Sequence, residues 1–89
     1  MDKRVEYNGL IADNIKRMRI EKGLSQEKLA EKLQGLGIDY THARISQIEL
    51  RKRPPTALLL VALKCLYDCE YSEFFSEVEV EYNDILKRD

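Results

Sequence analysis

The sequence is poor in the residue types on which most catalytic and metal sites depend. It contains one histidine, His42, and two cysteines among 89 residues. A hydrolytic triad needs a histidine between a nucleophile and an acid, and a structural zinc ion needs about four ligands. No second ligand lies near His42 in the sequence, and no glycine-rich phosphate loop is present. The sequence therefore predicts a protein that is not an enzyme and needs no metal and no cofactor.

Long apolar runs are also missing. A membrane-spanning helix needs roughly 20 consecutive apolar residues, whereas the longest run here covers residues 57–63 and is followed directly by Lys64. The charged N-terminus leads into no apolar stretch, which predicts no secretory signal. Cys65 and Cys69 are too few for a disulfide framework and are expected to pack as small apolar residues. We therefore expect a cytoplasmic protein with no membrane partner and no small-molecule ligand.

Charge is balanced overall but unevenly distributed. The net charge is −1, yet the chain has 12 basic against 8 acidic residues up to Thr56 and 3 against 8 from Ala57 onward. A basic front and an acidic rear are typical of a surface that binds a polyanion and turns its other side away. Chance clustering on a solvated surface is the alternative, and charge alone does not decide between the two.

Apolar residues recur mostly at helical spacing, so the chain is expected to form one small all-α domain. Cap and stop residues predict five short helices: from Asn8-Gly9 to Gly23, over residues 25–34 and 41–50, and after Thr56 and Ser72. Residues 51–55 read as a basic loop that is stopped by two prolines.

The last part of the chain has a different pattern. Val78, Val80 and Tyr82 alternate with glutamates, which is typical of a strand, and residues 83–89 are polar and expected to fray. We therefore expect a domain over residues 1–76, followed by a C-terminal extension over residues 77–89 that is a candidate for dimerisation.

The third predicted helix has the features of a groove-reading helix. Thr41 is its N-cap candidate, Ile45 and Ile48 form a narrow apolar stripe, and its outer face carries His42, Ala43, Arg44 and Gln47. A helix fits the major groove of DNA, where its N-terminal residues point at base edges. The N–H groups at such a helix start can also meet a phosphate.

Two motifs carry a resemblance to a known family. The stretch over residues 15–33, with Gly-Leu-Ser-Gln-x-x-Leu-Ala at residues 23–30, resembles the first two helices of the Cro/C1-type (XRE) repressor domain. Ile-Ser-x-Ile-Glu at residues 45–49, followed by a basic loop and proline, resembles its recognition helix. The resemblance covers residues 10–75. It implies a five-helix, lambda-repressor-like helix-turn-helix domain that binds double-stranded DNA and regulates transcription.

The resemblance also implies roles for individual residues. His42, Ala43 and Gln47 match positions that face base edges, and Arg44 matches a position that touches bases or backbone. Phosphate contacts are expected from Gln26, Lys52 and Arg53, together with Thr41 at the helix start. Arg19 and Glu49 match a structural ion pair between the first and third helices.

The turn between the second and third predicted helices departs from the family pattern. This turn usually has about 3–4 residues, whereas here residues 35–41 separate the helices, which allows Asp39 or Tyr40 to make contacts of its own. Two functions stay open. The first is a DNA-binding regulator, expected as a homodimer through the fifth helix and residues 78–82. The second is a protein-interaction module, antitoxin-like or anti-repressor-like, that keeps the helix-turn-helix only as a scaffold.

Overall fold

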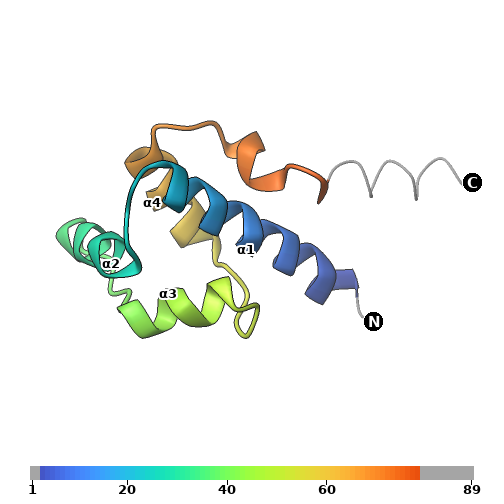
Figure 1. Ribbon diagram of the computed structural model, residues 1–89, viewed down its shortest axis with the longest axis horizontal. Coiled ribbons are helices and arrows are strands. Elements are labelled where there is room, and N and C mark those ends of the chain that lie inside the picture. The colour runs from blue at the N-terminus through green and yellow to red at the C-terminus, as the bar shows by residue number, and fades with distance from the viewer. Residues whose placement is uncertain (1–2, 79–89) are drawn as a thin grey trace, which may run out of the picture.

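The computed structural model describes residues 3–78, with side chains from Glu6 onward. The chain forms four α-helices, α1 (Lys3–Glu21), α2 (Gln26–Gly35), α3 (His42–Glu49) and α4 (Ala57–Tyr67), and a 3-10 helix, η1 (Tyr71–Phe75) (Figure 1). No strand occurs between residues 3 and 78, so the predicted all-α class is confirmed over this range. Apart from Val78, the predicted strand-like segment and the extension after it lie outside the described residues.

The prediction of five helices is not confirmed, because the described residues form four α-helices and a 3-10 turn, and two predicted helix starts were wrong. The fifth helix is a single 3-10 helix that begins after Glu70 rather than at Ser72. A capping box decides this start, because Glu73 Oε2 accepts the Glu70 backbone N–H at 2.9 Å and the Glu70 side chain accepts in return. The first helix begins at Lys3, before Asn8-Gly9, and continues through Gly9, which is buried beneath the side chain of Arg51.

The start of each of the next three helices follows from a local hydroxyl cap. Ser25, Thr41 and Thr56 are extended residues whose side-chain oxygens accept the backbone N–H three residues later, at 3.0, 3.1 and 3.2 Å. Each cap satisfies one of the N–H groups that a helix start leaves without a partner. All three N-caps were predicted from the sequence and are confirmed.

The four α-helices also end in one shared way. A residue with positive φ follows each helix, and the backbone N–H of the residue after it donates to the carbonyl five positions earlier in the chain. The positive-φ residues are Gly23, Gly37, Arg51 and Asp68. This is the Schellman pattern, which satisfies helix-terminal carbonyls and turns the chain sharply. Glycine adopts the left-handed conformation without steric cost, so Gly23 and Gly37 were readable as stops, whereas Arg51 was not.

The helices enclose one core around α1. Figure 1 shows α1 crossing the middle of the molecule, with α3 on one side and η1 on the other. The buried apolar residues come from every helix and from the linker before α3: Ala12, Ile15, Met18, Leu29, Ala30, Leu33, Tyr40, Ile45, Ile48, Leu59, Ala62, Leu63, Tyr67 and Phe74. The buried Asn14 side chain donates to the carbonyls of Phe74 and Ser76 at 2.9 and 3.0 Å. The core therefore holds α3 firmly against α1, while Asn14 anchors η1 to the opposite side.

Candidate nucleic-acid interface

Helix α3 has one buried face and one exposed face. Ile45, Ile48 and Glu49 are buried against the rest of the domain, and the four residues predicted to face base edges, His42, Ala43, Arg44 and Gln47, are all exposed. The apolar stripe seen in the sequence is therefore the inner face. The structure brings the four predicted base-contact residues together on one accessible surface.

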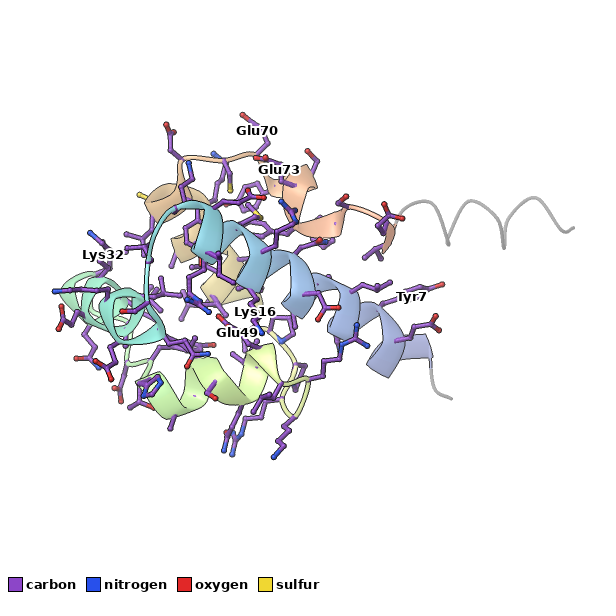
Figure 2. The ribbon with its side chains drawn as sticks, in the orientation of Figure 1. Tyr7, Lys16, Lys32, Glu49, Glu70 and Glu73 are labelled. Carbon is purple, nitrogen blue, oxygen red and sulfur yellow. The ribbon has the colours of Figure 1, made fainter. Side chains whose placement is uncertain are left out.

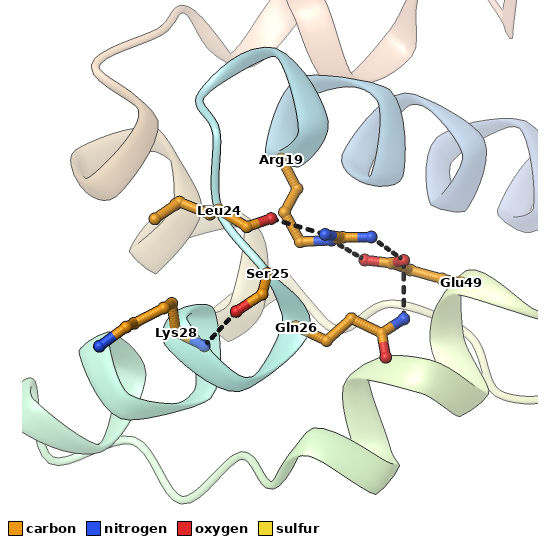
Figure 3. Close-up of polar contacts among 6 residues, drawn as sticks. All are labelled: Arg19, Leu24, Ser25, Gln26, Lys28 and Glu49. Carbon is orange, nitrogen blue, oxygen red and sulfur yellow. Dashed lines mark hydrogen bonds and ion pairs between the residues drawn. The ribbon is translucent and has the colours of Figure 1, made fainter.

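A buried ion pair ties α3 to α1 (Figure 3). Arg19 Nε and Nη2 donate to the two carboxylate oxygens of Glu49 at 2.7 and 2.9 Å, and the side chains are 10% and 2% exposed. Arg19 Nη1 also donates to the Leu24 carbonyl at 2.6 Å. The hydrogen bond to Glu49 raises the pKa of Arg19, although burial opposes this. The pair that the family resemblance implied is thus present, with the fork-like geometry that makes such contacts strong.

Gln26 is the third member of this cluster. Its Nε2 donates to Glu49 Oε1 at 3.0 Å, and the residue is half-buried at the start of α2 (Figure 3). The side chain therefore braces the end of α3 from α2, and this bond engages only one of the two amide hydrogens. Its predicted contact with a phosphate remains a prediction.

The linker between α2 and α3, residues 36–41, is a defined bend. Its first part is the Schellman turn around Gly37, in which Ile38 N–H donates to the Leu33 carbonyl at 3.0 Å. Its second part inserts Tyr40 into the core, where the residue is 3% exposed. The longer turn anticipated from the sequence is therefore an ordered element that contributes an aromatic ring to the domain interior.

Three cations follow α3, and only one of them is tied to the domain. Arg51 has a φ of 64° and its guanidinium binds both carboxylate oxygens of Asp13 on α1. That contact raises the pKa of Arg51. Lys52 and Arg53 are exposed and form no ion pair with any residue that the structure describes. The loop therefore presents two available positive charges beside the outer face of α3.

Acidic residues lie on the other side of the molecule. Figure 2 places Glu73 on η1 and Glu70 at its start, across α1 from α3, while Glu49 lies between α1 and α3. These two carboxylates from the acidic half of the sequence are therefore separated from α3 by α1. A polyanion approaching α3 would meet little repulsion from η1.

Sequence reasoning missed three residues that shape this surface. Tyr40 was noted only as free to make a contact, Gly9 only as part of a helix start, and Asp13 was not singled out. A Cβ added to Gly9 would lie 2.9 Å from the Arg51 side chain, so this glycine makes room for the arginine that reaches Asp13. The aromatic residue in the linker was the one available signal, and it pointed to Tyr40 alone.

Comparison with known proteins identifies the domain. The family model HTH_3, described as helix-turn-helix, matches residues 15–74, from the middle of α1 into η1. Searches of curated proteins and of solved structures found no match. Within the described residues, no helix is long and apolar enough to span a bilayer, and no cluster of three or more His, Cys, Asp or Glu residues could hold a metal ion.

Proposed function

Because the chain belongs to the Cro/C1-type helix-turn-helix family, we propose that it is a sequence-specific transcriptional regulator that binds duplex DNA with α3 in the major groove. One observation carries the proposal. The inner face of α3 is buried and braced by Arg19 and Gln26, while its outer face is exposed beside two unpaired cations. A rigid helix with a polar outer face and flanking positive charge is what groove reading requires.

The outer face of α3 offers complementary ways to read bases. The Gln47 amide can bind adenine N6 and N7 together, and Ala43 can meet a thymine methyl or allow close approach. His42 and Arg44 supply donors in the first turn of the helix, the part that points at base edges in this family. A good bidentate contact discriminates between bases by roughly 1–3 kcal/mol.

Lys52 and Arg53 are proposed to hold the phosphate backbone. Gln26 and Thr41, at the starts of α2 and α3, are proposed as further phosphate contacts. Contacts of this kind supply most of the sequence-independent affinity and release counterions, so the logarithm of the binding constant falls by about 0.9 per contact for each unit of log salt.

The proposed DNA-binding species is a symmetric homodimer. Two such domains read half-sites about 34 Å apart on one face of the duplex. Exposed apolar residues away from α3 support self-association: Leu58 and Val61 on α4 are 57% and 54% exposed, and Tyr71 on η1 is 42% exposed. Sedimentation of the chain with and without a palindromic duplex measures the number of copies that bind.

The test is the salt dependence of duplex binding. Binding of a duplex selected from a random pool is measured by fluorescence anisotropy over a range of salt concentrations. Lys52→Ala/Arg53→Ala should lower affinity and reduce the salt slope by about 3.6, because each protomer of the proposed dimer loses two phosphate contacts. The matched control is Lys22→Ala/Lys64→Ala, which removes two positive charges close to Cys69 on the acidic side, and it should leave the slope nearly unchanged.

Two results would contradict the proposal. Equal slopes for the loop variant and the control would remove Lys52 and Arg53 from the DNA contact. A selection that enriches no duplex would favour the protein-interaction function instead. Gln47→Ala adds a test of base reading, because it should relax the selected sequence at one position and leave the others unaltered.

A further inference from the structure

Tyr40, in the linker between α2 and α3, is held by hydrogen bonds from both its backbone and its side chain. Its hydroxyl lies 2.7 Å from Thr56 Oγ1, and that same Oγ1 accepts the Leu59 N–H and so caps α4. Its carbonyl accepts a hydrogen bond from Gln34 Nε2 at 3.2 Å, and its backbone N–H donates to the Ile38 carbonyl at 2.9 Å. The ring is therefore fixed at both its backbone and its tip, with elements on either side of α3 holding it.

Arg44 lies over this fixed ring. Its Cζ is 4.4 Å from the ring centroid of Tyr40, within the distance at which an aromatic face attracts a cation. Arg44 is exposed and forms no ion pair with a described residue. The aromatic ring is thus the one partner seen for the guanidinium charge among the described residues, and it leaves the exposed side of the group open to a ligand.

We propose that Tyr40 is a positioning residue that holds the Arg44 guanidinium ready to bind a guanine in the major groove. The proposal rests on the DNA-binding function proposed above. It also gives the long α2–α3 linker a role, because this linker places Tyr40 beneath Arg44. Arg44 is in the first turn of α3, on the outer face, where base edges are expected. Its planar fork matches guanine O6 and N7, and an aromatic support reduces the freedom that the side chain loses on binding.

The expected effects differ between the two residues. Loss of a bidentate arginine–guanine contact should cost roughly 5- to 150-fold in preference for guanine at one operator position. Loss of the aromatic support alone should cost less, about two- to five-fold at the same position, because an exposed cation–π contact is weak by itself.

The experiment begins with selection from a random duplex pool by the full chain. The operator position that Arg44 reads is the one whose preference disappears in Arg44→Ala. Affinities for the selected duplex and its single-base variants are then measured for Tyr40→Phe, Tyr40→Leu and Tyr40→Leu/Arg44→Ala. Tyr40→Phe should retain the preference, Tyr40→Leu should weaken it at that position only, and Tyr40→Leu should have no further effect when Arg44 is already absent.

Each alternative outcome is distinguishable. If Arg44→Ala lowers affinity evenly for all sequences, Arg44 binds phosphate and the guanine proposal is wrong. If Tyr40→Leu weakens binding evenly, or not at all, Tyr40 is a core residue without a positioning role. If Tyr40→Leu does not fold, a chemically synthesised chain with fluorinated phenylalanine at position 40 takes the place of this variant. Fluorination weakens the attraction of the ring face for a cation and leaves the shape of the ring nearly unchanged. A wild-type chain that enriches no duplex refutes the DNA-binding function itself.

Discussion

Replacing Glu49 by alanine tests how much of the domain's stability depends on the buried link between α1 and α3. The Glu49 carboxylate accepts three hydrogen bonds, two from Arg19 and one from Gln26, at 2.7 to 3.0 Å. Glu49→Ala removes all three and leaves the buried Arg19 charge with only the Leu24 carbonyl as its partner. Removing one member of a buried pair costs about 3–5 kcal/mol, because the remaining charge is desolvated and uncompensated.

That loss is large for a domain of this size. At roughly 0.05–0.15 kcal/mol per residue, a chain of this length has a free energy of unfolding of about 4–13 kcal/mol. We therefore expect Glu49→Ala to lose roughly a quarter or more of the free energy of unfolding, and its melting temperature to fall by roughly 12–40 °C. Urea unfolding followed by far-ultraviolet circular dichroism measures the change in the free energy of unfolding.

The chain offers a matched control. Arg17 and Glu21 form an ion pair at 3.0 Å on the same helix, but both side chains are about half exposed. Glu21→Ala should cost no more than about 0.5 kcal/mol, because exposed pairs contribute little. Similar losses for Glu49→Ala and Glu21→Ala would refute the argument from burial. Arg19→Met/Glu49→Leu should recover most of the stability lost in Glu49→Ala, since no charge is then left unpaired.

Four further substitutions test other parts of the structure by the same unfolding measurement. Gly35→Ala should raise stability by about 0.5–1 kcal/mol, because nothing lies within 4 Å of the added Cβ in this helical position. Gly37→Ala should lower stability by about 1–2 kcal/mol, because the φ of Gly37 is +81°. Equal effects of the two substitutions would contradict the turn assigned to Gly37. Thr56→Ala should lower stability by about 1 kcal/mol for the lost helix cap, and by more because the Tyr40 hydroxyl loses its partner. A loss smaller than that of a helix cap alone would count against the contact between Tyr40 and Thr56. Tyr67→Phe should raise stability by about 1 kcal/mol, because the buried Tyr67 hydroxyl has no hydrogen-bond partner among the described residues. Burial, and then the charge of Glu49, raises the pKa of Tyr67 in the folded state; the wild type should therefore lose stability above about pH 10, where the unfolded chain releases this proton, and Tyr67→Phe should lose less.

Local chemistry made much of the fold predictable. The three N-caps and the two glycine stops involve residues a few positions apart, so their hydrogen bonds depend only on the neighbouring backbone. The inner and outer faces of α3 follow from helical periodicity, which needs no knowledge of the rest of the chain. The predictions were wrong at the start of α1, which begins at Lys3 and continues through Asn8-Gly9, and at η1, where Glu70 rather than Ser72 is the N-cap.

The sequence by itself therefore determined the starts of α2, α3 and α4 and the residues that face outward from α3. Only the tertiary structure decided what supports that surface: Tyr40 beneath Arg44, and Asp13 holding the loop that carries Lys52 and Arg53. The physical reason is that these partners lie on different elements, and their distances depend on how helices pack rather than on spacing along the chain. A pattern of residues can assign a face to a helix, but the side chain that holds that face in place comes from elsewhere in the fold.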